Sequence, residues 1–148
     1  MELASRADSL GFAERTKKNL LYIEQAKSGG QDVHVVTQIV NSSLGLIVFP
    51  WEARADKAIR GKLLADLYEL GWPVWQEKPS SKGLGQLICG LRNAIAHRNV
   101  QFSSEDRAAS KVIITFASEH RDWHATISAY DLKNFCFEFI KFIENEVG

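Results

Sequence analysis

The stretch LGQLICGLRNAIAHRN, residues 84–99, has a near-ideal helical pattern. Its apolar residues recur three and four positions apart, which is the spacing of one face of an α-helix. The residues of that face are Leu84, Leu87, Ile88, Leu91 and Ile95. We therefore expect a helix that packs this face against a core and ends around residues 97–99.

Three segments before this helix also favour helix. Residues 12–27 are good helix formers and are followed by a Ser-Gly-Gly stop. The next segment has Asp32 as a candidate N-cap and ends at Pro50. The β-branched residues of this segment also suit a strand, but its length and its polar residues favour a helix. Residues 56–70 have an apolar helical stripe and are followed by a loop through residue 81.

After residue 99 the apolar period changes from helical to alternating. Residues 111–117 and 123–128 alternate, which predicts a β-hairpin over about 111–128 with a four-residue turn. The last segment returns to a helical pattern, and Ser128 with Asp131 has the spacing of a capping box. The sequence thus predicts a mainly α domain, a bundle of four to five helices with a hairpin before the last one.

Composition limits the class of protein. A length of 148 residues with 45% apolar residues suits one domain, which we expect to span 1–148 with a flexible segment at 1–10. The 18 basic and 18 acidic residues cancel, which argues against binding nucleic acid through bulk charge. Two cysteines, no signal peptide and no long apolar run predict a cytoplasmic protein without membrane contact.

Arg92, Asn93 and His97 stand at the end of the helix within residues 84–99 and are the main candidates for chemistry. Asn93 lies four residues before His97, so its amide can hydrogen-bond the imidazole. Arg92 and His97 are separated by about 140° around a helix axis, so one helix does not easily direct both at one atom. Two copies related by a two-fold axis can bring an arginine and a histidine to one cleft.

This pair of side chains suits cleavage of RNA by its own 2′-hydroxyl. Histidine exchanges a proton near neutral pH, and the arginine fork matches phosphate oxygens. His97 would move protons while Arg92 stabilised the charge that develops on the phosphorus oxygens. This chemistry needs no metal, and the sequence has no cluster with metal-ligand spacing.

The pattern Arg92-Asn93-xxx-His97 resembles the Arg-polar-xxx-His signature of HEPN (higher eukaryotes and prokaryotes nucleotide-binding) domains. Residues 41–52 are also similar to plasmid- and prophage-borne HEPN proteins. The resemblance implies a helical, usually dimeric, metal-independent endoribonuclease of toxin–antitoxin, antiphage or RNA-processing systems. In HEPN toxins paired with nucleotidyltransferase antitoxins a modified tyrosine follows the histidine by two residues. Here that residue is Asn99, so this modification is not expected.

The resemblance implies roles for these residues and for their partners. His97 is the expected general acid or base, Arg92 the phosphate and transition-state binder, and Asn93 the orienting residue. The products would be a 2′,3′-cyclic phosphate and a 5′-hydroxyl, with no cofactor and no metal. RNA, a second copy of the chain and an antitoxin protein are the expected partners.

Four further residues are candidates for substrate binding, each with an alternative. Arg15, Lys18 and Arg98 would hold the RNA backbone, but charged helix residues also commonly form a solvated face. Glu52 either anchors the active-site arginine or serves as an acid in the first turn of the next helix.

Two alternatives concern the motif itself. Arg92, Asn93 and His97 can simply form a solvated helix end, or the domain can be a non-catalytic HEPN-like module that binds RNA, a nucleotide or a protein.

The remaining chemical side chains are not expected to carry function; the histidines should be structural or solvent-exposed, and the cysteines should be small core residues. Three histidines have no common face in the predicted elements, both cysteines lie in or beside apolar stripes, and three tryptophans are expected to close the bundle rather than stack on bases. These residues are His34, His120, His124, Cys89, Cys136, Trp51, Trp72 and Trp75.

Overall fold

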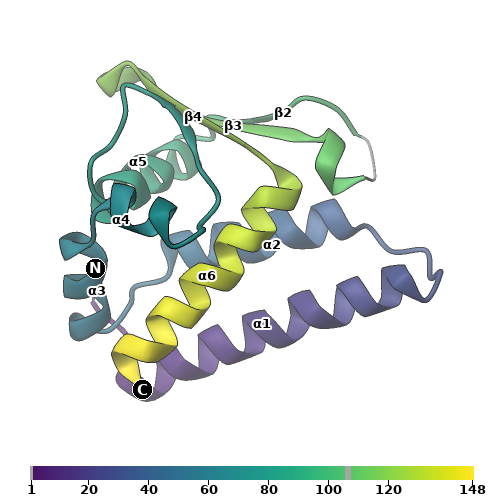
Figure 1. Ribbon diagram of the computed structural model, residues 1–148, viewed down its shortest axis with the longest axis horizontal. Helices are drawn as coiled ribbons and strands as arrows, with labels where there is room; N and C mark the ends of the chain where they lie inside the picture. Colours follow the sequence, from purple (N-terminus) through teal and green to yellow (C-terminus); the bar gives the residue numbers. More distant parts are fainter. Residues whose placement is uncertain (1, 106–107) are drawn as a thin grey trace.

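The computed structural model describes residues 2–105 and 108–148 and is mainly helical, with one small sheet at one end (Figure 1). The helices are α1 (Arg6–Ser28), α2 (Val35–Val48), α3 (Ala53–Gly61), α4 (Leu64–Glu69), α5 (Leu84–Ala96) and α6 (Ala129–Val147), with short 3₁₀ helices η1 (Ala109–Lys111) and η2 (Glu119–Arg121). The strands are β1 (Gln76–Lys78), β2 (Val100–Phe102), β3 (Ile113–Ser118) and β4 (Trp123–Ser128). This architecture confirms the predicted helical bundle with a hairpin before its last helix.

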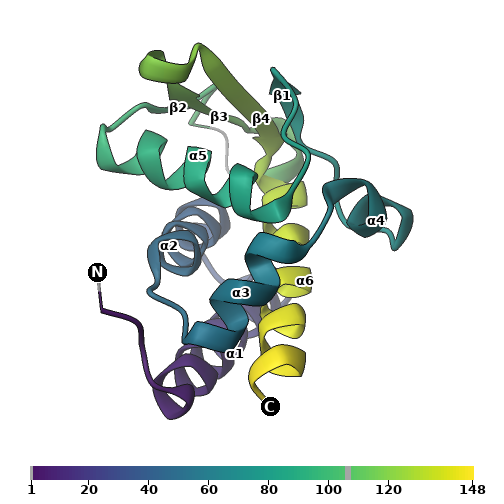
Figure 2. The ribbon, with the colours of Figure 1, turned by 90° about the vertical axis from the view of Figure 1, so that its left-hand side faces the viewer.

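The helices form a bundle, and α5 lies between it and the sheet. Helices α1, α2 and α6 contact one another, while α5 contacts α2 on one side and β3 on another. Figure 2 shows α5 in this position, with the sheet above it and α2 below. Because the candidate motif is on α5, its side chains lie where these two parts of the fold meet.

The sheet is antiparallel with strand order β1-β4-β3-β2. Its centre is the predicted hairpin, paired from Ile113 with Ser128 to Ser118 with Trp123. The predicted alternation is confirmed, since Ile114 and Phe116 are buried and Ile113 is exposed. The sequence did not reveal β1 and β2, because strands of three residues are too short to show a period.

Aromatic side chains fill the core and join its layers. Trp75 contacts Phe116 of β3 and Phe135 of α6, with ring centroids 5.6 and 5.5 Å apart. Trp51 meets Phe139 of α6 at 5.8 Å, edge to face. These tryptophans are buried, as predicted, and they close the bundle rather than offering faces to a ligand.

One predicted helix is wrong in its extent. Residues 56–70 do not form a single helix, because α3 and α4 are separated by an extended step at Lys62 and Leu63. The backbone there bonds to the segment before α5: Leu84 N–H donates to Lys62 O at 2.8 Å, and Leu64 N–H to Lys82 O at 2.9 Å. A tertiary contact therefore overrides an apolar pattern that continues through the break.

Two helix starts also differ from the sequence prediction. Helix α1 begins at Arg6 rather than Phe12, because Ser5 caps it by accepting from Asp8 N–H, so residues 6–10 are helical. Helix α2 is capped at His34 and not at Asp32. The Ser128 cap of α6 is confirmed, since its hydroxyl accepts from Asp131 N–H at 3.0 Å. In the described residues no helix has the length and apolar character that crossing a bilayer requires.

The two cysteines have opposite environments. Cys136 is buried as predicted, with its sulfur 3.0 Å from the Ser43 hydroxyl. Burial raises the pKa of the Cys136 thiol to about 12, and the Ser43 hydrogen bond opposes this only in part. Cys89 was expected to be a core residue, but it is exposed because α5 presents it outside the sheet and bundle contacts.

A thiol reagent at pH 8 should distinguish these environments. In a Cys89→Ser variant we expect no reaction in the folded protein and one thiol after unfolding in guanidinium, because the buried Cys136 thiol is neither accessible nor ionised. Absorbance of the released chromophore measures both states. A folded Cys89→Ser protein that reacted as fast as the unfolded one would contradict this packing.

Candidate active site

The end of α5 is fixed by backbone hydrogen bonds. Arg98 N–H donates to Ile95 O at 3.1 Å, and Asn99 N–H donates to Ala94 O at 2.8 Å. This pair of bonds is the Schellman arrangement, which requires a left-handed residue just after the cap. Arg98 takes that conformation, with φ 59°, where glycine is the usual residue. His97 is therefore the cap residue, and its exposed side chain lies at a defined helix end.

Arg92 is held by the C-terminal end of α2. Its Nε donates to Ile47 O at 2.6 Å, and Nη2 donates to Phe49 O at 3.2 Å. The last carbonyls of a helix have no partners within it, and they carry the negative end of the helix dipole. Pro50 has no N–H that could satisfy them. The guanidinium of Arg92 thus satisfies Ile47 O, shares Phe49 O with the Trp51 N–H, and is oriented by both carbonyls.

Arg92 keeps donors for a ligand. A guanidinium has five N–H groups, and the two bonds to α2 use two of them. The side chain is half-buried, and no other hydrogen bond to it is found in residues 2–105 and 108–148. Its fixed position and unused donors suit an anion such as a phosphodiester.

Helix α3 places charges near Arg92. Burial lowers the pKa of Arg92; the carboxylate of Asp56 opposes this shift, and the guanidinium of Arg60 adds to it. Arg60 also forms an ion pair with Asp56 at 3.0 Å. Two guanidinium groups therefore lie near one carboxylate at this edge of α5, which leaves excess positive charge there.

Glu52 has the second of its two predicted roles. Its Oε1 accepts from Ala55 N–H at 2.6 Å, so it caps α3. The active-site arginine is anchored by backbone carbonyls of α2 instead.

Small side chains form the exposed strip of α5 beside these charges. The strip consists of Cys89 and Ala96, seven positions apart on one helix side, while Gly85 on the same side packs against Arg60 of α3. At about 100° per residue, Arg92 lies along one edge of this strip and His97 lies beyond the other edge. The spacing argument that one helix separates the two side chains therefore applies to the observed helix.

Two arginines that the sequence analysis did not select lie near this strip. Arg60 and Arg121 line a shallow hollow of about 330 Å³ with Gly85, Gln86 and Cys89. Arg121 Nη2 is 3.5 Å from the Cys89 sulfur. No local sequence signal identifies these arginines, since α3 and η2 reach α5 only through the tertiary fold.

His97 lies next to a histidine from the hairpin. Its ring centroid is 6.0 Å from that of His120, with the planes at 69°. His97, Asn99, Ser118, Glu119 and His120 line a pocket of about 230 Å³. His120 is solvent-exposed, which is one of the two states expected for it, and the fold places it in the same pocket as His97.

Asn93 and His97 are joined by the backbone. His97 N–H donates to Asn93 O at 3.0 Å as part of the helix. Within the described part of the chain the Asn93 amide makes no hydrogen bond to the imidazole, although the two residues share a helix side.

Arg15 and Lys18 lie far from this site in the fold. Both are exposed on α1, which packs on α2 and α6 at the opposite side of the bundle from α5 (Figures 1 and 2). Arg98, by contrast, follows His97 directly. The predicted basic patch is thus divided, and the arginines around α5 come from α3 and η2 instead.

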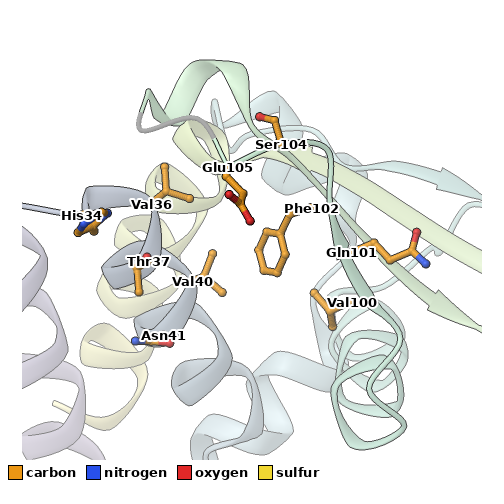
Figure 3. A pocket seen from close by; sticks show the side chains of 10 residues that line it. All are labelled: His34, Val36, Thr37, Val40, Asn41, Val100, Gln101, Phe102, Ser104 and Glu105. Atoms are coloured by element: carbon orange, nitrogen blue, oxygen red, sulfur yellow. The ribbon is translucent and has the colours of Figure 1, made fainter.

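A separate open pocket of about 760 Å³ lies between α2 and the segment that begins at β2. Figure 3 shows Val40 and Phe102 pointing toward each other across it. Its lining does not include Arg92, Asn93 or His97. In residues 2–105 and 108–148 no three His, Cys, Asp or Glu side chains are grouped to hold a metal ion.

The anchoring of Arg92 predicts a stability difference between the two motif residues. Arg92→Ala should lower the free energy of unfolding by about 1–3 kcal/mol, because Ile47 O and Phe49 O lose a charged donor and only Phe49 O keeps a backbone partner. His97→Ala should change it by less than about 0.5 kcal/mol, because the side chain is exposed. Urea titration followed by circular dichroism measures both, and equal effects of the two substitutions would contradict the anchoring role.

Comparison with protein-family models matches residues 2–148 to the family described as HEPN pEK499 p136. Neither the search of curated proteins nor the search of solved structures found a match to this chain. The family match agrees with the resemblance seen at the Arg92-Asn93-xxx-His97 pattern and with the helical fold. Since the match spans residues 2–148, this chain belongs to the HEPN pEK499 p136 family.

Proposed function

We propose that this protein is a metal-independent endoribonuclease that cleaves RNA through the 2′-hydroxyl of the substrate. The observation that carries the proposal is the state of Arg92, which is fixed by two α2 carbonyls and retains unused N–H donors. Such a group binds a phosphate without reorganising, which is the condition for stabilising charge in a transition state. Arg92 binds the scissile phosphate and the charge that develops on its oxygens.

His97 transfers protons in this reaction. The imidazole is exposed at the end of α5, so the backbone of a single-stranded RNA can reach it. The 2′-oxygen attacks phosphorus and the 5′-oxygen leaves, and each step requires a proton transfer that histidine performs near neutral pH. Asn93 lies on the same helix side and orients the bound substrate or the imidazole.

The RNA backbone is held by local charge. The net charge of the chain is zero, but Arg60 and Arg121 border the strip of α5 and Arg98 follows His97. When a guanidinium binds a phosphate, counterions are released from the RNA, so RNA binding is expected to weaken as the salt concentration rises.

The functional unit is a dimer formed across α5. The strip of Cys89 and Ala96 lets a second helix approach closely, because both side chains are small and exposed. Arg92 and His97 on either side of the strip would then meet groups of the second copy in one cleft. In the cell the activity is that of a toxin or a defence component, and an antitoxin protein is the expected regulatory partner.

The cleavage reaction is tested with a fluorescent single-stranded RNA. The wild-type protein should cleave it to 2′,3′-cyclic phosphate and 5′-hydroxyl ends, with unchanged rate in EDTA. His97→Ala should reduce the rate by about 10²-fold or more. His124→Ala is the matched control, since His124 is an exposed histidine on β4 outside the pocket at the α5 end.

Three results would reject the endoribonuclease: no cleavage by the wild-type protein, activity that survives in His97→Ala, or loss of activity in EDTA. Stable RNA binding without cleavage would instead favour the second candidate, a non-catalytic module. The pocket between α2 and β2 favours that candidate, because it is larger than the one at His97 and separate from the motif.

The dimer is tested through the exposed thiol of Cys89. If α5 forms the interface, the rate of Cys89 modification should fall as the protein concentration rises through the dimer range seen by size-exclusion chromatography. Ala96→Arg, at an exposed position of the same helix side, should both prevent dimerisation and restore fast modification. A dimer whose Cys89 reacts as fast as that of the diluted monomer would place the interface elsewhere.

A further inference from the structure

The end of α5 and the tip of the hairpin bring two exposed imidazoles together. His97 caps α5, and His120 lies in η2 between β3 and β4. Their ring centroids are 6.0 Å apart, and both rings line the same pocket of about 230 Å³. The two residues are 23 positions apart in the sequence, so only the fold makes them neighbours.

Both histidines stand on elements whose backbone is fixed. Asn99, just after His97, accepts from Ala117 N–H at 3.0 Å, which ties the end of α5 to the end of β3. On the hairpin side, Asp122 closes η2 in a left-handed conformation and donates its N–H to Glu119 O at 3.3 Å. The backbone positions of the two histidines are therefore set by secondary structure rather than by loose loops.

Close packing below the pocket keeps the hairpin tip against α5. Gly90 lies under the Trp123 ring, and a Cβ built at Gly90 would be 2.9–3.1 Å from three of its atoms. The Trp123 indole also donates to Glu77 Oε1 at 3.2 Å. These contacts hold β4, and with it the turn that carries His120, close to the helix.

We propose that His120 is a second catalytic histidine and that His97 and His120 act as an acid–base pair on one phosphodiester. This inference rests on the proposed function. One neutral imidazole takes the proton of the 2′-hydroxyl while the 2′-oxygen forms a bond to phosphorus. The other, as imidazolium, gives a proton to the 5′-oxygen as the P–O5′ bond breaks. One proton is taken and one is given, so no oxidant, metal or further reactant is required.

The distance between the two rings suits a general acid and a general base that act on one phosphodiester. An imidazole must come within about 2.6–3.2 Å of the oxygen that it serves, and two rings 6.0 Å apart can each reach a different oxygen of one phosphodiester. The charged groups around the pair are Glu119 in the pocket wall, and Arg98, Arg121 and Asp122 next to the two histidines in the chain. Ser118 and Asn99 add hydrogen-bonding groups to the wall.

The test compares His97→Ala, His120→Ala and the control His124→Ala in the full-length protein. The wild-type protein should give a bell-shaped pH profile of kcat/KM on the RNA substrate. Each of the two pocket variants should lose one limb of the bell and about 10²–10⁴-fold of the rate. Circular dichroism should show no change of fold, because both side chains are exposed, and His120→Gln should behave as His120→Ala.

A second substrate assigns the two roles. A ribonucleoside 3′-(4-nitrophenyl phosphate) has a leaving group that needs no proton. The variant that lacks the general acid should cleave it at close to the wild-type rate, while the variant that lacks the general base should remain slow. The activated substrate should therefore restore the cleavage rate of only one of the two variants, His97→Ala or His120→Ala.

The outcomes separate the two proposals. If His120→Ala cleaves RNA with the wild-type rate and both limbs of the pH profile while His97→Ala is inactive, the His120 proposal is overturned and the endoribonuclease stands. Rescue of both variants, or of neither, would also overturn the pair. If the wild-type protein cleaves neither substrate, both proposals fail.

Discussion

The contact between the Arg92 guanidinium and the end of α2 is the interaction on which the candidate site depends. A helix that stops before a proline leaves carbonyl oxygens without partners, and in a partly buried position these oxygens need a donor. Arg92 supplies it to Ile47 O from α5, and it also donates to Phe49 O, which accepts from Trp51 N–H as well. The same contact joins two helices and orients a cation, so structural and chemical demands meet in one side chain. A role in stability and a role in catalysis are therefore compatible at Arg92.

Much of the fold could be predicted because its long elements have clear periods. The apolar face of α5, the alternation of β3 and β4, and the Ser128 cap of α6 are local signals, and the structure follows them. The break between α3 and α4 could not be predicted, because it is caused by backbone bonds to the segment just before α5. Strands β1 and β2 exist only as additions to the hairpin, and no period shows in three residues.

The residues of the candidate site also fall into those that local sequence signals identify and those that only the tertiary fold brings together. Arg92 and His97 were selected by their spacing on one helix, which is a local property. His120, Arg60 and Arg121 come to α5 from other elements, and nothing in their own segments marks them. The role of Glu52 also depended on the tertiary structure. Backbone carbonyls at the end of α2 anchor Arg92, so the Glu52 carboxylate is not needed there and caps α3 instead. The family match covers the chain but does not select these neighbours.

Gly90 has a consequence for how this domain can vary. The absence of a side chain there lets the indole of Trp123 lie directly on the helix, and the strand that follows the turn is seated by that contact. A single methyl group at this position would come within 2.9–3.1 Å of the outer atoms of that indole, so the ring or the strand that carries it would have to shift. The seating of β4 on α5 thus depends on a position that lies outside the pocket of the two imidazoles. A substitution at residue 90 would therefore change how the hairpin meets α5 without removing any polar side chain of the pocket.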